Sequence, residues 1–191
     1  MATHIALLHS ITIGKGRRLV MADWRAMMEA IGLNQPRTLI ATGNAVFESE
    51  HATVRQLENR LETAFEQCFG RHVDTIVKTR AHWRKLAGSN PFSEQAERDP
   101  ARVAVRIMRT PLDDAAIEAL MPYATQGESL SLAEGHLWIH FEQEPARSRL
   151  MSQLTTKRLG IGTMRNWNTI RGLNEMIRQG DASGSTVALR N

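Results

Sequence analysis

The first half of the chain alternates between short apolar runs and longer segments whose apolar residues recur every three or four positions. Short runs of this kind predict buried strands, whereas the three-to-four spacing predicts helices that bury one face. We therefore expect strands at 4–8, 37–41, 45–49 and 73–77, and helices at 21–31, 54–69 and 80–87. Thr42-Gly43-Asn44 predicts the tight turn between the second and third strands, because Gly and Asn tolerate positive φ angles.

The second half repeats this order of elements without an obvious repeat of residues. Its patterns predict strands at 102–108, 129–132, 137–141 and 162–165, and helices at 112–121, 146–159 and 169–177. Each half then has the order β-α-β-β-α-β followed by a trailing helix, which is the order of a ferredoxin-like unit. We expect an α+β fold of two tandem ferredoxin-like subdomains, each with an antiparallel sheet.

Changes in composition predict the domain boundaries. Residues 1–92 form the first subdomain and residues 101–179 form the second. The stretch 93–100 is polar and lacks periodicity, so we expect a linker. Residues 180–191 contain Gly and Ser with few apolar positions, and this composition predicts a flexible tail.

The overall charge narrows the classes of partner only slightly. The 191 residues include 24 Lys and Arg against 20 Asp and Glu, a net charge of +4. An anionic small molecule, a nucleotide or a nucleic acid is therefore plausible, but a dedicated nucleic-acid binder usually has a denser basic surface. The single cysteine, Cys68, excludes a disulfide framework and favours a reducing compartment. No apolar stretch reaches the roughly 20 residues of a membrane span, so we expect a cytoplasmic protein that does not use a membrane.

The first candidate binding element is the loop Gly14–Arg18, which carries Lys15 and Arg17 between two glycines and the next cation. Glycines allow backbone N–H groups to point into a loop, and such a loop can hold phosphate. The spacing matches neither a P-loop nor a dinucleotide-binding motif. The alternative is a solvated loop whose glycines only form the turn.

The second candidate is the polar stretch at 165–169. Arg165 offers charge, Asn166 and Asn168 offer hydrogen bonds, and Trp167 offers a stacking surface for a base. The alternative is structural, with Thr169 or Asn168 capping the following helix and Trp167 packed between the halves. If the stretch does bind, we expect it to form a cleft between the subdomains together with Lys15 and Arg17.

No arrangement of residues identifies an enzyme, a cofactor or a metal site. The seven histidines are scattered, and His136 and His140 in one strand stand roughly 13 Å apart, too far to share an ion. The acidic residues of helix 54–69, such as Glu58 and Glu62, are interpreted as solvated charge. Two further hypotheses stay open. One is an enzyme in the same cleft with His9 as general base, and the other is a module for protein interaction or oligomerisation.

Several motifs along the chain resemble one family. They are Ala6-Leu7-Leu8 with Ile13-Gly14, Met21-Ala22, Thr42-Gly43-Asn44-Ala45-Val46-Phe47, Asn90-Pro91-Phe92, Lys157-Arg158-Leu159-Gly160 and Thr163-Met164-Arg165-Asn166-Trp167-Asn168-Thr169. Together they are similar to an uncharacterised bacterial family classed as a domain of unknown function, over residues 3–177. The resemblance implies two similar α+β subdomains and no established activity.

The chain departs from that family after the first strand. Members usually carry Arg-Gly-Ile-Asn followed by Val-Gly-Gly, whereas this chain has His9-Ser10-Ile11-Thr12 followed by Ile13-Gly14-Lys15. A site that used the family's Arg, Gly and Asn would therefore be altered here. The polar stretch at 166–169 keeps the family pattern.

Overall fold

A computed structural model describes residues 1–12, 18–50 and 52–187, with side chains described as far as residue 179. The chain divides into two compact units. The first unit comprises residues 1–84 together with residues 171–191, and the second unit comprises residues 85–170. The chain passes from one unit to the other within two helices, α3 (Arg80–Gly88) and α7 (Trp167–Val187).

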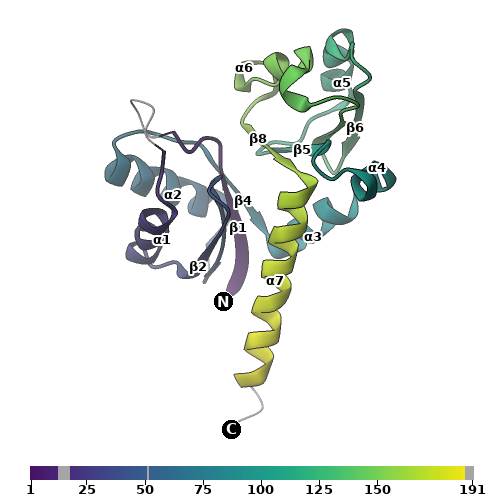
Figure 1. Cartoon of the computed structure of the whole chain (residues 1–191). Coiled ribbons are helices and arrows are strands. Elements are labelled where there is room, and N and C mark those ends of the chain that lie inside the picture. The colour runs from purple at the N-terminus through teal and green to yellow at the C-terminus, as the bar shows by residue number, and fades with distance from the viewer. Residues whose placement is uncertain (13–17, 51, 188–191) are drawn as a thin grey trace. The chain divides into compact units, whose positions relative to one another are not determined.

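The first unit is built on a four-stranded antiparallel sheet with the strand order β2-β3-β1-β4. Its strands are β1 (Ala2–Leu8), β2 (Asn34–Leu39), β3 (Asn44–Ser49) and β4 (Thr75–Thr79), and its helices are α1 (Met21–Ala30) and α2 (Val54–Phe69). Helices α1 and α2 lie on one face of this sheet (Figure 1). A capping box begins α2, because Thr53 Oγ1 accepts from Gln56 N while Gln56 Oε1 accepts from Thr53 N.

The second unit repeats the same topology with the strand order β6-β7-β5-β8. Its strands are β5 (Val103–Met108), β6 (Ser129–Ala133), β7 (His136–His140) and β8 (Gly162–Asn166). Its helical segments are α4 (Ser93–Arg98), α5 (Asp114–Leu120), η1 (Met121–Tyr123), η2 (Pro145–Arg147), η3 (Arg149–Gln153) and α6 (Thr156–Leu159). The two sheets confirm the expected α+β fold of two ferredoxin-like subdomains.

The continuous helix expected at 146–159 is wrong. The chain there forms two 3₁₀ turns and one short α-helix instead. Ser148 Oγ accepts from Leu150 N, and Thr155 Oγ1 accepts from Arg158 N. These local side-chain bonds start new turns and so interrupt a longer helix.

Two other stretches contain more helix than their composition indicated. The expected linker at 93–100 contains α4, which buries Ala96 and begins with the bond from Ala96 N to Phe92 O. Helix α7 continues to Val187, well into the expected tail, because glycine weakens a helix interior by only about 1 kcal/mol and no proline interrupts it. Residues 188–191 lie outside the described part of the chain.

Both faces of the first sheet are buried. Ala6 and Leu8 of β1 face α1 and α2 in a core that also contains Phe65, whereas Ile5 and Leu7 point to the opposite face and are also fully buried. The later part of α7, which belongs to this unit, packs on that opposite face. Arg37 Nη2 donates to Met176 O at 3.0 Å, and a side chain at Gly172 would collide with Leu39.

Candidate metal centre

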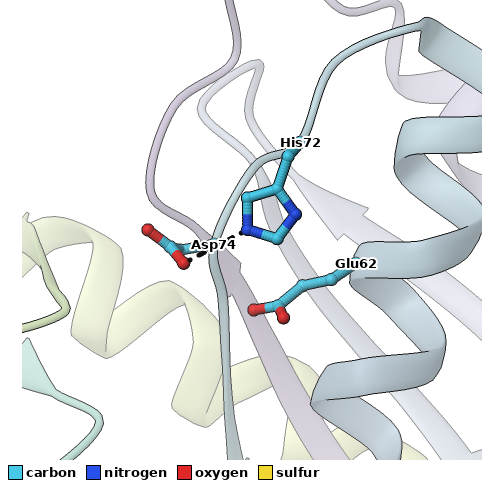
Figure 2. Close-up of side chains that lie close together, drawn as sticks. All are labelled: Glu62, His72 and Asp74. Carbon is cyan, nitrogen blue, oxygen red and sulfur yellow. Dashed lines mark hydrogen bonds and ion pairs between the residues drawn. The ribbon is translucent and has the colours of Figure 1, made fainter.

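One group of side chains in the described residues has the composition of a metal site. Glu62 comes from the middle of α2, and His72 and Asp74 come from the segment that joins α2 to β4. Gly70 ends α2 in the left-handed conformation, with φ 71°, and such a residue reverses the chain at the end of a helix. The reversal carries His72 and Asp74 back alongside α2, so that they meet Glu62, which precedes them by ten and twelve positions in the sequence (Figure 2).

The three side chains each place a ligand atom within 4.8 Å of the others. His72 Nε2 lies 3.4 Å from Asp74 Oδ1, and Glu62 Oε1 accepts a hydrogen bond of 2.9 Å from Thr75 N. The Glu62 side chain is buried, Asp74 is partly exposed and His72 is exposed. The cluster therefore has one anchored carboxylate on the protein side and one accessible imidazole on the solvent side.

Imidazole nitrogen and carboxylate oxygen together suit first-row divalent metals. The bond from Thr75 N to Glu62 is the kind of outer contact that orients a metal-binding carboxylate. The same atoms have a second use without a metal, because a protonated His72 would form ion pairs with Asp74 and with Glu66, whose Oε2 lies 3.9 Å from Nδ1. Exposed ion pairs of this kind contribute little stability.

The segment that follows β1 lies against this cluster. His9 N donates to Asp74 O at 2.9 Å. Arg71 Nη1 donates to Thr12 O at 3.0 Å, and Thr12 forms an isolated antiparallel bridge with Arg18. The segment beside the cluster is therefore joined to two arginine residues, to Arg71 through its side chain and to Arg18 through its backbone.

The interpretation of the acidic residues of α2 as solvated charge is wrong for two of them. Glu58 and Glu62 are 6% and 9% exposed. Their carboxylates accept the backbone N–H groups of Val77 and Thr75 in the edge strand β4, which satisfies donors that the sheet leaves unpaired. Burial lowers the pKa of the neighbouring Lys78, and Glu58 opposes that shift.

Sequence offered a weak signal for these glutamates. They are four residues apart, and each directly follows a fully buried leucine of the apolar stripe, Leu57 or Leu61. Both therefore lie at the border of the buried face of the helix. Nothing in the sequence showed that an edge strand would supply N–H donors at that border.

The structure describes some of the residues that the sequence predicted as important, but not all of them. Lys15 and Arg17 lie outside the described residues. The turn at Thr42-Gly43-Asn44 is tied to the end of β1, because Leu8 N donates to Gly43 O and Asn44, fully buried, donates to Leu39 O and Thr42 Oγ1.

Arg165 lies in β8 and is largely buried, with Nη1 donating to Thr163 Oγ1 and Met164 O, each at 2.7 Å. Burial lowers the pKa of its guanidinium to about 10. The expectation that Thr169 or Asn168 caps the helix is wrong, because α7 begins earlier, at Trp167. Asn166 Oδ1 accepts from both Thr169 N and Thr169 Oγ1 at 3.1 Å.

Two further residues of this stretch differ in burial. The Trp167 ring is half-buried, and its centroid lies 6.0 Å from the centroid of the Trp138 ring. Asn168 is exposed. The bonds from Arg165 Nη1 to Thr163 and Met164, and those from Thr169 to Asn166 Oδ1, are made within the second unit.

Comparison with known proteins defines the family. The model of a family described as a protein of unknown function, DUF1697, matches residues 1–138, and the chain belongs to this family. The match ends before the polar stretch at 165–169. A search of curated proteins found no match.

A solved structure shares the fold. It is described as the structure of conserved bacterial protein SP0830 from Streptococcus pneumoniae, with a TM-score of 0.71 and 22% sequence identity, over 92% of this chain and 98% of that one. Identity at this level supports the fold alone. Among the described helices, none has both the length and the apolar composition that a membrane span requires.

Proposed function

We propose that this protein binds a divalent metal ion through Glu62, His72 and Asp74. The observation that carries the proposal is the convergence of three ligand atoms within 4.8 Å around a buried, hydrogen-bonded carboxylate. A cation placed there would stabilise the buried negative charge of Glu62. The mixed nitrogen and oxygen donors favour Mn²⁺, Co²⁺ or Zn²⁺ over Ca²⁺ and Mg²⁺, which prefer oxygen ligands alone.

Three protein ligands leave positions on the ion for water or another molecule. Sites with an open position are typical of metals that act on a ligand, whereas structural zinc sites are closed by four protein ligands. The proposal therefore describes a binding site with an exposed ion and does not specify a reaction.

A second candidate function, the binding of an anionic ligand, is favoured by the distribution of charge. The first unit contains 14 Lys and Arg against 10 Asp and Glu, while the second unit contains 10 of each. The net charge of +4 therefore belongs entirely to the first unit. Long-range attraction of an anion would act on that unit.

Calorimetric titration with MnCl₂ and CoCl₂ tests the metal site, with MgCl₂ and CaCl₂ for comparison. We expect one ion per chain, and a loss of affinity of at least tenfold in His72→Ala and Asp74→Ala. Glu62→Gln keeps an acceptor for Thr75 N while removing a charge, so it should weaken binding without unfolding the unit.

The matched control is His82→Ala, which removes an exposed histidine from α3 in the same unit. This variant should bind Mn²⁺ and Co²⁺ like the unaltered protein. Equal affinities for His72→Ala and His82→Ala would show that the ions bind only to surface histidines in general, and the proposal would fail.

A further inference from the structure

We infer that the metal ion at Glu62, His72 and Asp74 holds a phosphate group of a small ligand, whose remaining oxygens are bound by Arg71 and Arg18. This inference rests on the proposed function, since the ion supplies one side of the site. The two arginines supply the other side.

The position of the arginines follows from one residue. The carbonyl oxygen of Thr12 accepts a hydrogen bond from the Arg71 guanidinium, and Thr12 pairs with Arg18 through the backbone. Arg71 is also the direct neighbour of His72 in the chain. Arg71 is thus held by its side chain, and Arg18 by its backbone, to the segment that bonds to the cluster through His9 N and Asp74 O.

Both arginines are exposed. Within the described part of the chain, neither forms an ion pair with an acidic side chain. A guanidinium carries five N–H donors in a planar fork, and the carbonyl of Thr12 occupies one direction of the Arg71 fork. The geometry of the fork matches two oxygens of a phosphate.

The metal and the arginines have complementary roles toward such a ligand. A divalent ion with open positions binds one phosphate oxygen and withdraws charge from the group. The guanidinium groups donate hydrogen bonds to the other oxygens. Phosphate binds to neither element alone as strongly as to both, so the affinity for phosphate should depend on the metal.

The test is a calorimetric titration of inorganic phosphate into the full chain, with and without one equivalent of Mn²⁺. We expect phosphate to bind at least tenfold more tightly when Mn²⁺ is present. Arg71→Ala and Arg18→Ala should each weaken phosphate binding at least fivefold and leave the affinity for Mn²⁺ unchanged. Arg55→Ala is the matched control, because it removes an exposed arginine from the other end of α2.

The outcomes separate this inference from the function on which it rests. Absence of Mn²⁺ binding overturns both. Normal Mn²⁺ binding without any binding of phosphate overturns the phosphate site alone, as does an equal effect of Arg55→Ala and Arg71→Ala. Tight binding of a single-stranded oligonucleotide that does not change with Mn²⁺ would replace the small phosphate ligand with a nucleic acid and overturn the inference.

Discussion

The two units reach one topology with very different amounts of helix. In the first unit, the connection between the third and fourth strands is the 16-residue helix α2. In the second, the corresponding connection is made of η2, η3 and the four-residue α6. Both nevertheless pair their strands in the same order. Strand pairing therefore defines the fold, and the covering layer only has to deliver apolar side chains to the sheet.

The same comparison explains why the candidate metal centre occurs in the first unit. Helix α2 is long enough to place Glu58 and Glu62 along the edge strand β4. Helix α6 is too short for such a pair and carries Lys157 and Arg158 instead. Near the end of α6, the buried Arg106 donates to Gly160 O, and burial lowers the pKa of this arginine. The connection between the third and fourth strands thus carries two buried carboxylates in the first unit, and Lys157 and Arg158 in the second.

The largest expected effect tests whether 3₁₀ turns support a sheet as firmly as a long helix. Phe65→Ala removes a fully buried ring from α2, and we expect a cost of about 3–5 kcal/mol. Leu150→Ala removes a fully buried side chain from η3, and we expect a cost near the lower end of about 2–5 kcal/mol because short turns can collapse into the cavity. Urea unfolding measures both. A larger loss of unfolding free energy for Leu150→Ala than for Phe65→Ala would mean that the short helical segments adjust less to a cavity than α2 does.

An intermediate effect tests the hairpin turns that the units share. Gly43 and Gly135 have φ angles of 74° and 71°. A Cβ at Gly43 would lie 2.8 Å from Leu8 Cβ, and one at Gly135 would lie 2.9 Å from Pro111 Cα. Replacing either glycine by alanine combines left-handed strain of about 1–2 kcal/mol with overpacking of about 1–3 kcal/mol.

Two other glycines serve as controls for that experiment. Gly70 and Gly160 also have positive φ angles, but a Cβ at either position meets nothing within 4 Å. Their alanine variants should therefore lose only the conformational part. That part is about 1–2 kcal/mol at the left-handed Gly70 and about 1–3 kcal/mol at Gly160, whose ψ of −177° is open almost only to glycine. If thermal denaturation gave the same loss for all four variants, the contacts beneath the hairpin turns would be irrelevant to stability.

The smallest expected effect separates the units by their response to acid. Burial lowers the pKa of His4 below 6.5, against a weaker opposing bond to Ala2 O. In Glu128, burial raises the pKa, but bonds from Ser148 and Gln126 outweigh it and hold the pKa below 4.5. Both groups have a lower pKa in the folded state than in the unfolded state. The stability that each group contributes is therefore present at higher pH and is lost as the pH falls.

The two losses occur in different ranges of pH. The contribution of His4 in the first unit declines below about pH 6.5, and that of Glu128 in the second unit declines only below about pH 4.5. His4→Gln removes the titrating group, so its melting temperature should fall less between pH 7 and pH 5 than that of the unaltered protein. If the melting temperatures of the two proteins fell equally between pH 7 and pH 5, His4 would not be the group that causes the loss of stability.

Much of the fold followed from the apolar pattern, because alternation in strands and helical spacing are local properties. The stripe from Val54 to Phe69 predicted α2 to the residue. The helix expected at 146–159 was wrong because Ser148 and Thr155 bond to nearby backbone, a competition that apolar spacing does not record. No helix was expected where α4 lies, and the length of α7 was underestimated, because polar composition does not exclude a helix.

The candidate metal centre could not be predicted from the sequence. Glu62 and His72 are ten residues apart and fit no ligand spacing of a known motif. They meet only because Gly70 reverses the chain and Thr75 holds the carboxylate. By contrast, the polar stretch at 165–169 stands out in the sequence because it combines Arg, Asn and Trp, although Asn166 caps a helix and Arg165 bonds within its own strand.

Helix α7 has a consequence for the way this chain folds during synthesis. The residues from Arg171 onward belong to the first unit, where they pack against Leu39 and bond to Arg37. A ribosome emits the chain from its N-terminus, so the second unit, complete at residue 170, has all its residues before the first unit does. Until α7 has emerged, the face of the first sheet that contains Ile5 and Leu7 has no cover from its own unit's helix, and the earliest part of the protein to be made is the last to be finished.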